Sequence, residues 1–95
     1  MQLRMVWVDM NTLLTTLAKH MELVSTKHTL HLSLDEKLPL LEGDPDKLTQ
    51  VITNLLSNAI KYSPLGGDIL IKSSREGNSV HVSIQDHGIG IASEF

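Results

Sequence analysis

Apolar residues recur at helical spacing in two stretches of the chain, residues 10–25 and residues 46–62. Asp9 stands where the N-cap of the first helix belongs. The second stretch is preceded by Asp44-Pro45, a capping residue followed by a proline suited to the first helical position, and it is stopped by Ser63-Pro64. The pattern predicts two amphipathic helices. Their apolar positions are Leu13, Leu14, Leu17, Met21 and Val24 in the first helix, and Leu48, Val51, Ile52, Leu55, Leu56 and Ala59 in the second.

Alternating apolar and polar residues predict strands around these helices. Residues 29–34 alternate strictly, as in a half-buried strand, and residues 1–8 are interpreted as a strand at a sheet edge. Residues 68–74 and 80–86 predict two strands joined by a turn at Gly77-Asn78. Residues 35–43 are expected to be a connector and residues 87–91 a glycine loop. The order β-α-β-α-β-β indicates an α+β fold, a two-layer α/β sandwich with an antiparallel hairpin at its end.

Composition excludes several classes of function. The net charge of −3, without a basic run, argues against a nucleic-acid partner. The chain has 0 cysteines, which excludes disulfides and thiolate metal sites and favours a reducing compartment, here the cytoplasm. No apolar run approaches the length of a membrane span, so we expect no direct membrane contact. Whether a larger parent protein is membrane-anchored is left open.

A polar stripe runs along one margin of the second predicted helix. At about 100° per residue, Asn54, Asn58 and Lys61 line up beside the apolar face, and Tyr62 falls on the core side of the stripe. An asparagine oxygen suits Mg²⁺, a lysine suits phosphate, and a tyrosine ring offers a flat face to a base. Taken alone, the stripe favours the alternative interpretation, a solvated helix surface with a lysine near the helix C-terminus.

A second candidate site follows the last predicted strand. Asp86 continues the apolar row of Val80, Val82 and Ile84, and a carboxylate on a core face is costly unless something pairs with it. A ligand amine is one such partner. Gly88 and Gly90 follow at once and allow the backbone to approach a ligand closely. The alternative is an acid at a strand end before an ordinary glycine turn.

Together the two motifs are far more specific than either alone. The pair NLLSNAIKYSP and DHGIGI resembles the N box and G1 box of the ATP-binding domain of bacterial sensor histidine kinases, within the superfamily that includes gyrase, a chaperone class and mismatch-repair ATPases. The stretches VDMNTLLTTLAKHMEL and EGDPDKLTQVITNLLSNAIKYSP extend this resemblance over essentially residues 1–95. The chain is thus interpreted as one partial domain of this kind.

The resemblance implies roles for the motif residues. Asn58 matches the residue that ligates Mg²⁺ between the ATP phosphates, and Asn54 its companion near the same phosphates. Lys61 matches a phosphate contact, Tyr62 the residue packed on adenine, and Asp86 the acceptor from the adenine amine. The G1 glycines are Gly88 and Gly90. ATP and Mg²⁺ are therefore the implied cofactors.

The resemblance also implies a reaction for the parent protein. The gyrase branch uses a glutamate general base where this chain has Asn54, which takes no proton at neutral pH. Phosphoryl transfer to a histidine on a partner helical hairpin is therefore favoured over hydrolysis, with a response regulator as the further partner. His20, in the context AKHMEL, does not resemble the acceptor motif, and no catalytic residue is assigned.

Several family segments are missing from the printed sequence: the F box, the lid over ATP and the G2 box. Because phosphoryl transfer depends on positioning around the phosphates, we expect the isolated chain to be inactive as a kinase while retaining weak nucleotide binding. An alternative is a catalytically silent binding or assembly module, natural or engineered, that self-associates through an exposed apolar sheet face and strand edge.

Overall fold

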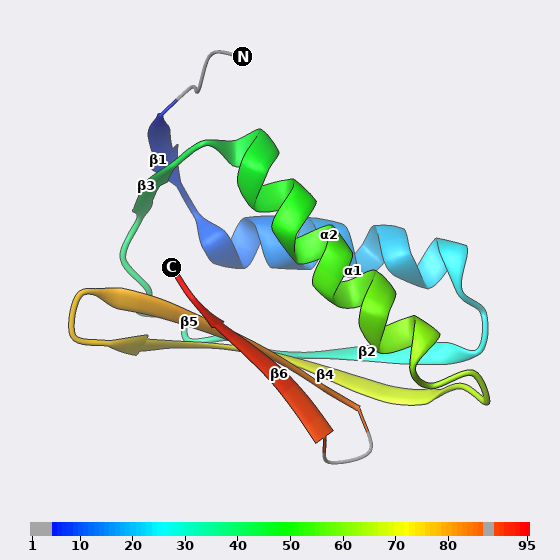
Figure 1. Cartoon of the computed structure of the whole chain (residues 1–95). Coiled ribbons are helices and arrows are strands. Elements are labelled where there is room, and N and C mark those ends of the chain that lie inside the picture. The colour runs from blue at the N-terminus through cyan, green and yellow to red at the C-terminus, as the bar shows by residue number, and fades with distance from the viewer. Residues whose placement is uncertain (1–4, 87–88) are drawn as a thin grey trace.

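The computed structural model describes residues 5–86 and 89–95, with the backbone alone for residues 89–92. Two helices lie on one face of a four-stranded sheet, as Figure 1 shows, and a separate pair of short strands lies beside the beginnings of the helices. The elements in chain order are β1 (Val6–Val8), α1 (Met10–Val24), β2 (His28–Ser33), β3 (Leu41–Gly43), α2 (Pro45–Lys61), β4 (Gly67–Glu76), β5 (Ser79–Asp86) and β6 (Ile89–Glu94).

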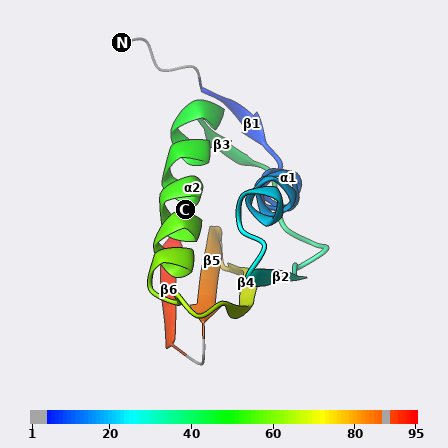
Figure 2. The ribbon, with the colours of Figure 1, turned by 90° about the vertical axis from the view of Figure 1, so that its right-hand side faces the viewer.

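The main sheet has the strand order β2-β4-β5-β6. Strand β2 runs parallel to β4, and the two other pairings are antiparallel. The view in Figure 2 separates the two layers, with α1 and α2 side by side and the sheet below them. The predicted two-layer sandwich and the predicted hairpin at Gly77-Asn78 are both confirmed, because β4 and β5 pair from Ile69↔Asp86 to Glu76↔Ser79.

The core lies between the helices and the sheet. Helical residues spaced by three and four contribute to it from one side, and alternate residues of β4 and β5 from the other. Two predicted core positions are wrong. Val24, the last residue of α1, is 66% exposed because the helix ends there, and Val51, at the edge of the α2 apolar arc, is 42% exposed. Residues with 0% exposure are Met10, Leu14, Ile52, Leu56, Ile69, Ile71 and Val82.

Three details of the predicted strands are wrong, and residues 1–4 of the strand predicted for residues 1–8 lie outside the described residues. The first strand does not join the main sheet, because β1 pairs with β3 across the register Val6↔Gly43 to Val8↔Leu41. Strand β3 itself lies inside the expected 35–43 connector. Both β1 and β3 end two residues before a helix begins, and since the helices pack together, the segments that lead into them are neighbours.

The third correction concerns the expected glycine loop at residues 87–91. Strand β6 begins at Ile89 and pairs with β5, with Gly90 opposite Gln85. Glycine is depleted in strands because it lacks a side chain to pack, so the stretch carries a weak strand signal. The backbone pairing with β5, which continues through two hydrogen bonds between Val80 and Phe95, defines the strand.

The turn between α2 and β4 makes a close approach to the turn between α1 and β2. Gly66 has φ +87°, and a Cβ atom built there would lie 2.3 Å from the carbonyl oxygen of Lys27. Gly77 also has a positive φ, +59°, but nothing lies within 4 Å of its Cβ position. Gly66 is therefore required by contact with a neighbouring backbone, and Gly77 by its own backbone angle alone.

We expect Gly66→Ala to destabilise the chain by clearly more than the about 1 kcal/mol that a left-handed residue costs. The reason is that the new methyl group overlaps backbone that cannot turn away as a side chain can. Urea denaturation followed by circular dichroism measures the loss, with Gly77→Ala as the matched control. Equal losses in the two variants would contradict the close approach of the two turns.

Candidate functional site

The second helix begins as the sequence predicts. Asp44 has extended backbone angles, and its side chain accepts a hydrogen bond of 2.9 Å from the Asp46 amide. Pro45 occupies the start of the helix, where its missing N–H is not needed. Ile52, Leu56 and Ala59 are buried on one face and hold α2 against the core. The positions of the polar residues on the other faces follow from this anchoring.

The predicted polar stripe lies on the solvent-facing side of α2. Asn54, Asn58 and Lys61 are all exposed, spaced by four and three residues so that they lie about one turn apart. Tyr62 does not lie on the core side, as the helical wheel predicts, but is 71% exposed. The reason is that α2 ends at Lys61, so Tyr62 is the cap residue with φ −85° and ψ 0° and leaves the helical direction.

Asp86 lies at the end of β5 on the face of the sheet that the helices cover. It follows Val80, Val82 and Ile84 in the alternation, which are at most 2% exposed. Its cross-strand neighbour on β4 is Ile69, which is 0% exposed. One carboxylate oxygen, Oδ1, is fully buried. The carboxylate is thus held at the rim of an apolar core, as the strand alternation predicts.

The structure describes only one of the two glycines of the second motif. Gly88 lies outside the described residues. Gly90 is part of β6 and lies opposite Gln85, next to the pairing of Asp86 with Ile89. The glycine loop expected at residues 87–91 therefore does not include Gly90, whose backbone continues a regular antiparallel ladder.

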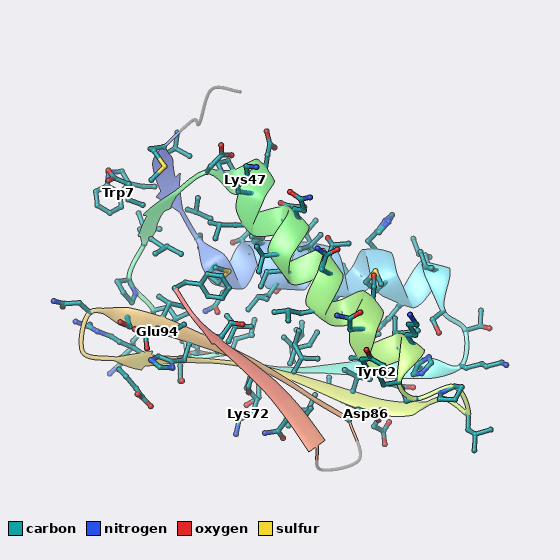
Figure 3. All side chains as sticks on the ribbon, viewed as in Figure 1. Trp7, Lys47, Tyr62, Lys72, Asp86 and Glu94 are labelled. Carbon is teal, nitrogen blue, oxygen red and sulfur yellow. The ribbon has the colours of Figure 1, made fainter. Side chains whose placement is uncertain are left out.

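The tertiary structure brings the ends of the two motifs to the same end of the molecule. In Figure 3 Tyr62 and Asp86 lie near one another, the first at the end of α2 and the second at the end of β5. Figure 2 agrees, because the last turn of α2 lies above the end of the sheet where β5 meets β6. The exposed ring of Tyr62 and the half-buried carboxylate of Asp86 thus flank the same edge, although Asp86 lies 24 positions after Tyr62 in the chain.

The polar side chains of α2 suit a metal ion that is coordinated partly by the chain and partly by a bound ligand. Asn54 and Asn58 present two neutral carboxamide groups to solvent on one side of α2. Among the described residues, no group of three or more histidine, cysteine, aspartate or glutamate side chains could hold a metal ion. Mg²⁺ keeps several waters and takes few protein ligands beside substrate phosphates, so a single carboxamide oxygen fits its chemistry.

The sequence interpretation missed one group of residues at this end of α2. His28 is 7% exposed and Ser63 is 4% exposed, and they are joined through two contacts of His28 Nε2, to the Ser63 carbonyl oxygen at 2.7 Å and to Oγ at 2.9 Å. A histidine at the start of a strand and a serine after a helix form no recognisable sequence motif. Only their contact across 35 positions reveals the pair.

Within the described part of the chain, neither helix has both the length and the apolar character needed to cross a bilayer. The longer of them, α2, has 17 residues and carries the polar stripe.

Comparisons with known proteins identify the family. Residues 43–95, which include both motifs, match the family of histidine kinase-, DNA gyrase B- and HSP90-like ATPases. The adaptive-response sensory kinase SasA of Synechococcus elongatus is 54% identical over 55 residues, 57% of this chain. The sensor histidine kinase ZraS of Escherichia coli is 37% identical over 92 residues, 92% of this chain. The chain spans only 14% of SasA and 19% of ZraS.

Solved structures share the fold. The full-length kinase ShkA in complex with AMPPNP superposes with a TM-score of 0.75 at 26% identity, over 88% of this chain and 19% of ShkA. The Acinetobacter baumannii histidine kinase AdeS gives a TM-score of 0.76 at 27% identity, over 98% of this chain and 47% of AdeS. The histidine kinase ThkA in complex with the response regulator TrrA gives 0.75 at 26% identity, over 84% of this chain and 25% of the matched chain.

The family match covers more than half of the chain, the two motifs fall inside it, and ShkA and AdeS share the fold at TM-scores of 0.75 and 0.76. The chain therefore belongs to the histidine kinase-, DNA gyrase B- and HSP90-like ATPase family, as an ATP-binding domain of the sensor histidine kinase type.

Proposed function

We propose that this chain binds ATP with Mg²⁺ at the edge between the end of α2 and the end of β5. The observation that carries the proposal is Asp86, a carboxylate with one oxygen buried at the rim of the core, at the same end of the molecule as Tyr62. A buried acceptor beside an exposed aromatic ring is suited to a planar base that carries an amine. The neighbouring kinase ShkA was solved with AMPPNP, which supports a nucleotide with this chemistry.

In this proposal the residues divide by the part of the nucleotide that they bind. Asp86 accepts a hydrogen bond from the adenine amine, Tyr62 packs on the ring, and the backbone at Gly88 and Gly90 lies close to the nucleotide. On α2, Asn58 provides an oxygen ligand to Mg²⁺, Asn54 lies beside the same phosphates, and Lys61 contributes a positive charge. Mg²⁺ supplies the neutralisation of phosphate charge that phosphoryl transfer requires.

For the parent protein we propose transfer of the γ-phosphoryl group from ATP to a histidine. An imidazole nitrogen on a helical hairpin attacks the γ-phosphorus, the bond to the bridging oxygen breaks, and ADP leaves. The absence of a carboxylate at Asn54 favours this acceptor over water, because a carboxamide cannot take the proton of an attacking water molecule. A response regulator is the further partner, as in the ThkA complex with TrrA. Since ATP is the donor, we place this domain in the cytoplasm.

The proposal is tested by titrating the 95-residue chain with ADP and Mg²⁺ in an isothermal titration calorimeter. Saturable binding of one ADP per chain is expected. GDP is the control ligand, because guanine carries a carbonyl oxygen where adenine carries the amine, and two acceptors would then face each other at Asp86. We expect ADP to bind at least about tenfold more tightly, the effect of one lost hydrogen bond to a charged group. No ADP binding, or equal affinity for GDP, would contradict the proposal.

Asn58→Ala is expected to weaken ADP binding at least about tenfold when Mg²⁺ is present, since changes even beside a metal ligand reduce metal affinity 10–100-fold. With Mg²⁺ removed by EDTA, the variant and the wild-type chain should bind ADP alike. Asn78→Ala is the control, because it makes the same substitution at an exposed turn between β4 and β5. An equal loss with and without Mg²⁺ would argue against a metal ligand at position 58.

A further inference from the structure

A polar cluster, with two buried residues and one half-buried residue, joins the end of α2 to the turn that follows α1. We define this cluster as Ser25, His28 and Ser63. The Nδ1 atom of His28 lies 2.6 Å from Ser25 Oγ, and Nε2 lies 2.7 Å from the Ser63 carbonyl oxygen. Ser63 Oγ donates to the Ala59 carbonyl oxygen at 2.7 Å, inside the last turn of α2. The cluster therefore connects the cap residue that follows α1, the first residue of β2 and the chain just after α2.

The hydrogen bonds of the cluster define the protonation of the imidazole ring in its neutral form. A carbonyl oxygen can only accept, so His28 Nε2 carries the hydrogen and donates to Ser63. The Ser63 hydroxyl donates its own hydrogen to the Ala59 carbonyl oxygen, and so it too accepts a hydrogen bond from Nε2. Nδ1 then accepts from the Ser25 hydroxyl. Every polar hydrogen in the cluster has an acceptor, which makes the connection between the elements specific.

Backbone contacts beside the cluster reinforce the same connection. The Gly67 amide donates to the Lys27 carbonyl oxygen at 3.0 Å, and Gly66 approaches the same carbonyl too closely for a side chain. The chain after α2 is thus held against the chain after α1 from Ser63 to Gly67. Lys61 and Tyr62 directly precede this held segment, yet both side chains are exposed.

We propose that His28 is a positioning residue for the nucleotide site, an inference that rests on the proposed function. By holding Ser63, it fixes the point at which α2 ends and so places Lys61 and Tyr62 for phosphate and adenine. Helix ends otherwise fray. A site whose side chains become ordered only on binding has a lower affinity, because that ordering costs free energy. His28 touches no nucleotide in this arrangement, because its ring is buried behind Ser63.

Two substitutions distinguish the hydrogen bond at Nε2 of His28 from the hydrogen bond at Nδ1. A glutamine amide can place an N–H group about where Nε2 lies, whereas an asparagine side chain reaches only about as far as Nδ1. His28→Gln should therefore keep the contact with Ser63 and bind ADP with Mg²⁺ nearly as the wild-type chain does. His28→Asn should keep only the hydrogen bond with Ser25. It should bind ADP about tenfold more weakly, because Lys61 and Tyr62 are then displaced from their binding positions.

A matched pair of buried serines controls for loss of stability. Ser63→Ala removes the hydroxyl between His28 and Ala59. Ser73, which is 6% exposed, makes a similar pair of hydrogen bonds, to Asn11 Oδ1 at 2.7 Å and from the Asp35 amide at 3.0 Å, and neither partner belongs to α2. Both Ser→Ala variants should lower the thermal midpoint to a similar extent. Only Ser63→Ala should also weaken ADP binding, measured by calorimetry at a temperature where all variants are folded.

Hydrogen exchange of the Tyr62 and Gly66 amides, whose acceptors are Asn58 and Ser63, gives a readout without ligand. Faster exchange at these amides in His28→Asn and Ser63→Ala, but not in Ser73→Ala, is expected. If Ser63→Ala and Ser73→Ala weaken ADP binding equally, or neither does, the positioning role is overturned while the proposed function stands. If the wild-type chain binds no ADP, the proposed function fails and the role of His28 fails with it. Should His28→Asn not fold, the serine pair decides.

Discussion

Asp86→Asn is expected to lower the affinity of the chain for ADP with Mg²⁺ by about 10- to 100-fold. A hydrogen bond to a charged acceptor contributes about 1.5–3 kcal/mol, and a carboxamide oxygen is a weaker acceptor than a carboxylate. The change is nearly isosteric, so the position of the side chain at the end of β5 should be kept. Calorimetric titration measures the affinity, and circular dichroism checks that the variant is folded.

The matched control is Asp68→Asn, the same substitution on β4. The Asp68 side chain is 79% exposed and contacts His31 Nε2 at 3.0 Å, and both residues alternate with buried core residues, so they lie on the face of the sheet opposite the helices. This variant should bind ADP as the wild-type chain does. The GDP comparison sharpens the result, because Asp86→Asn should also reduce the preference for ADP over GDP. If the Asp86→Asn variant binds ADP with wild-type affinity, Asp86 is not part of the nucleotide site.

Leu56→Ala is expected to reduce the free energy of unfolding by about 2–5 kcal/mol, the range for a buried leucine replaced by alanine. Leu56 is 0% exposed and lies in the core cluster between α2 and the sheet, one turn of the helix from both Ile52 and Ile60. A domain of this size has a total stability of about 5–15 kcal/mol, so the loss is a large fraction of it. Urea denaturation followed by circular dichroism measures the change through the midpoint.

Leu65→Ala provides the control for this core substitution. Leu65 is 97% exposed, and the same change there should alter stability by no more than about 0.5 kcal/mol. The two leucines lie only nine positions apart, so a difference between the variants reports burial rather than local sequence. A loss below about 1 kcal/mol for Leu56→Ala would contradict the burial of this face of α2.

Local patterns in the sequence predicted the second helix and its caps closely. Asp44 caps α2 and Pro45 begins it, because both effects act within one turn of the chain. The β4–β5 hairpin was predictable for the same reason, since Gly77 and Asn78 form the turn that joins two alternating segments. Asp86 was predictable as a core-facing carboxylate because strand alternation extends to it from Val80, Val82 and Ile84.

The errors arose where a distant segment decides the outcome. Residues 89–94 form β6 because β5 lies alongside, although Gly90 weakens the strand signal. The first strand pairs with β3 rather than the main sheet because the two helices bring their preceding segments together. Tyr62 is exposed because α2 ends one residue earlier than the helical wheel assumes.

By itself the sequence determined the family, the two helices, the hairpin and the residues of the nucleotide motifs, since all of these are contained in short stretches of the chain. Only the tertiary structure decided which strands pair, that the ends of α2 and β5 meet at one edge, and that His28 is buried against Ser63. The physical reason is that strand pairing and burial of a polar side chain depend on a partner, and the partner of His28 lies 35 positions away. The asparagine stripe of α2 thus follows from the sequence, but the exposure of Tyr62 beyond the end of the helix is seen only in the tertiary structure.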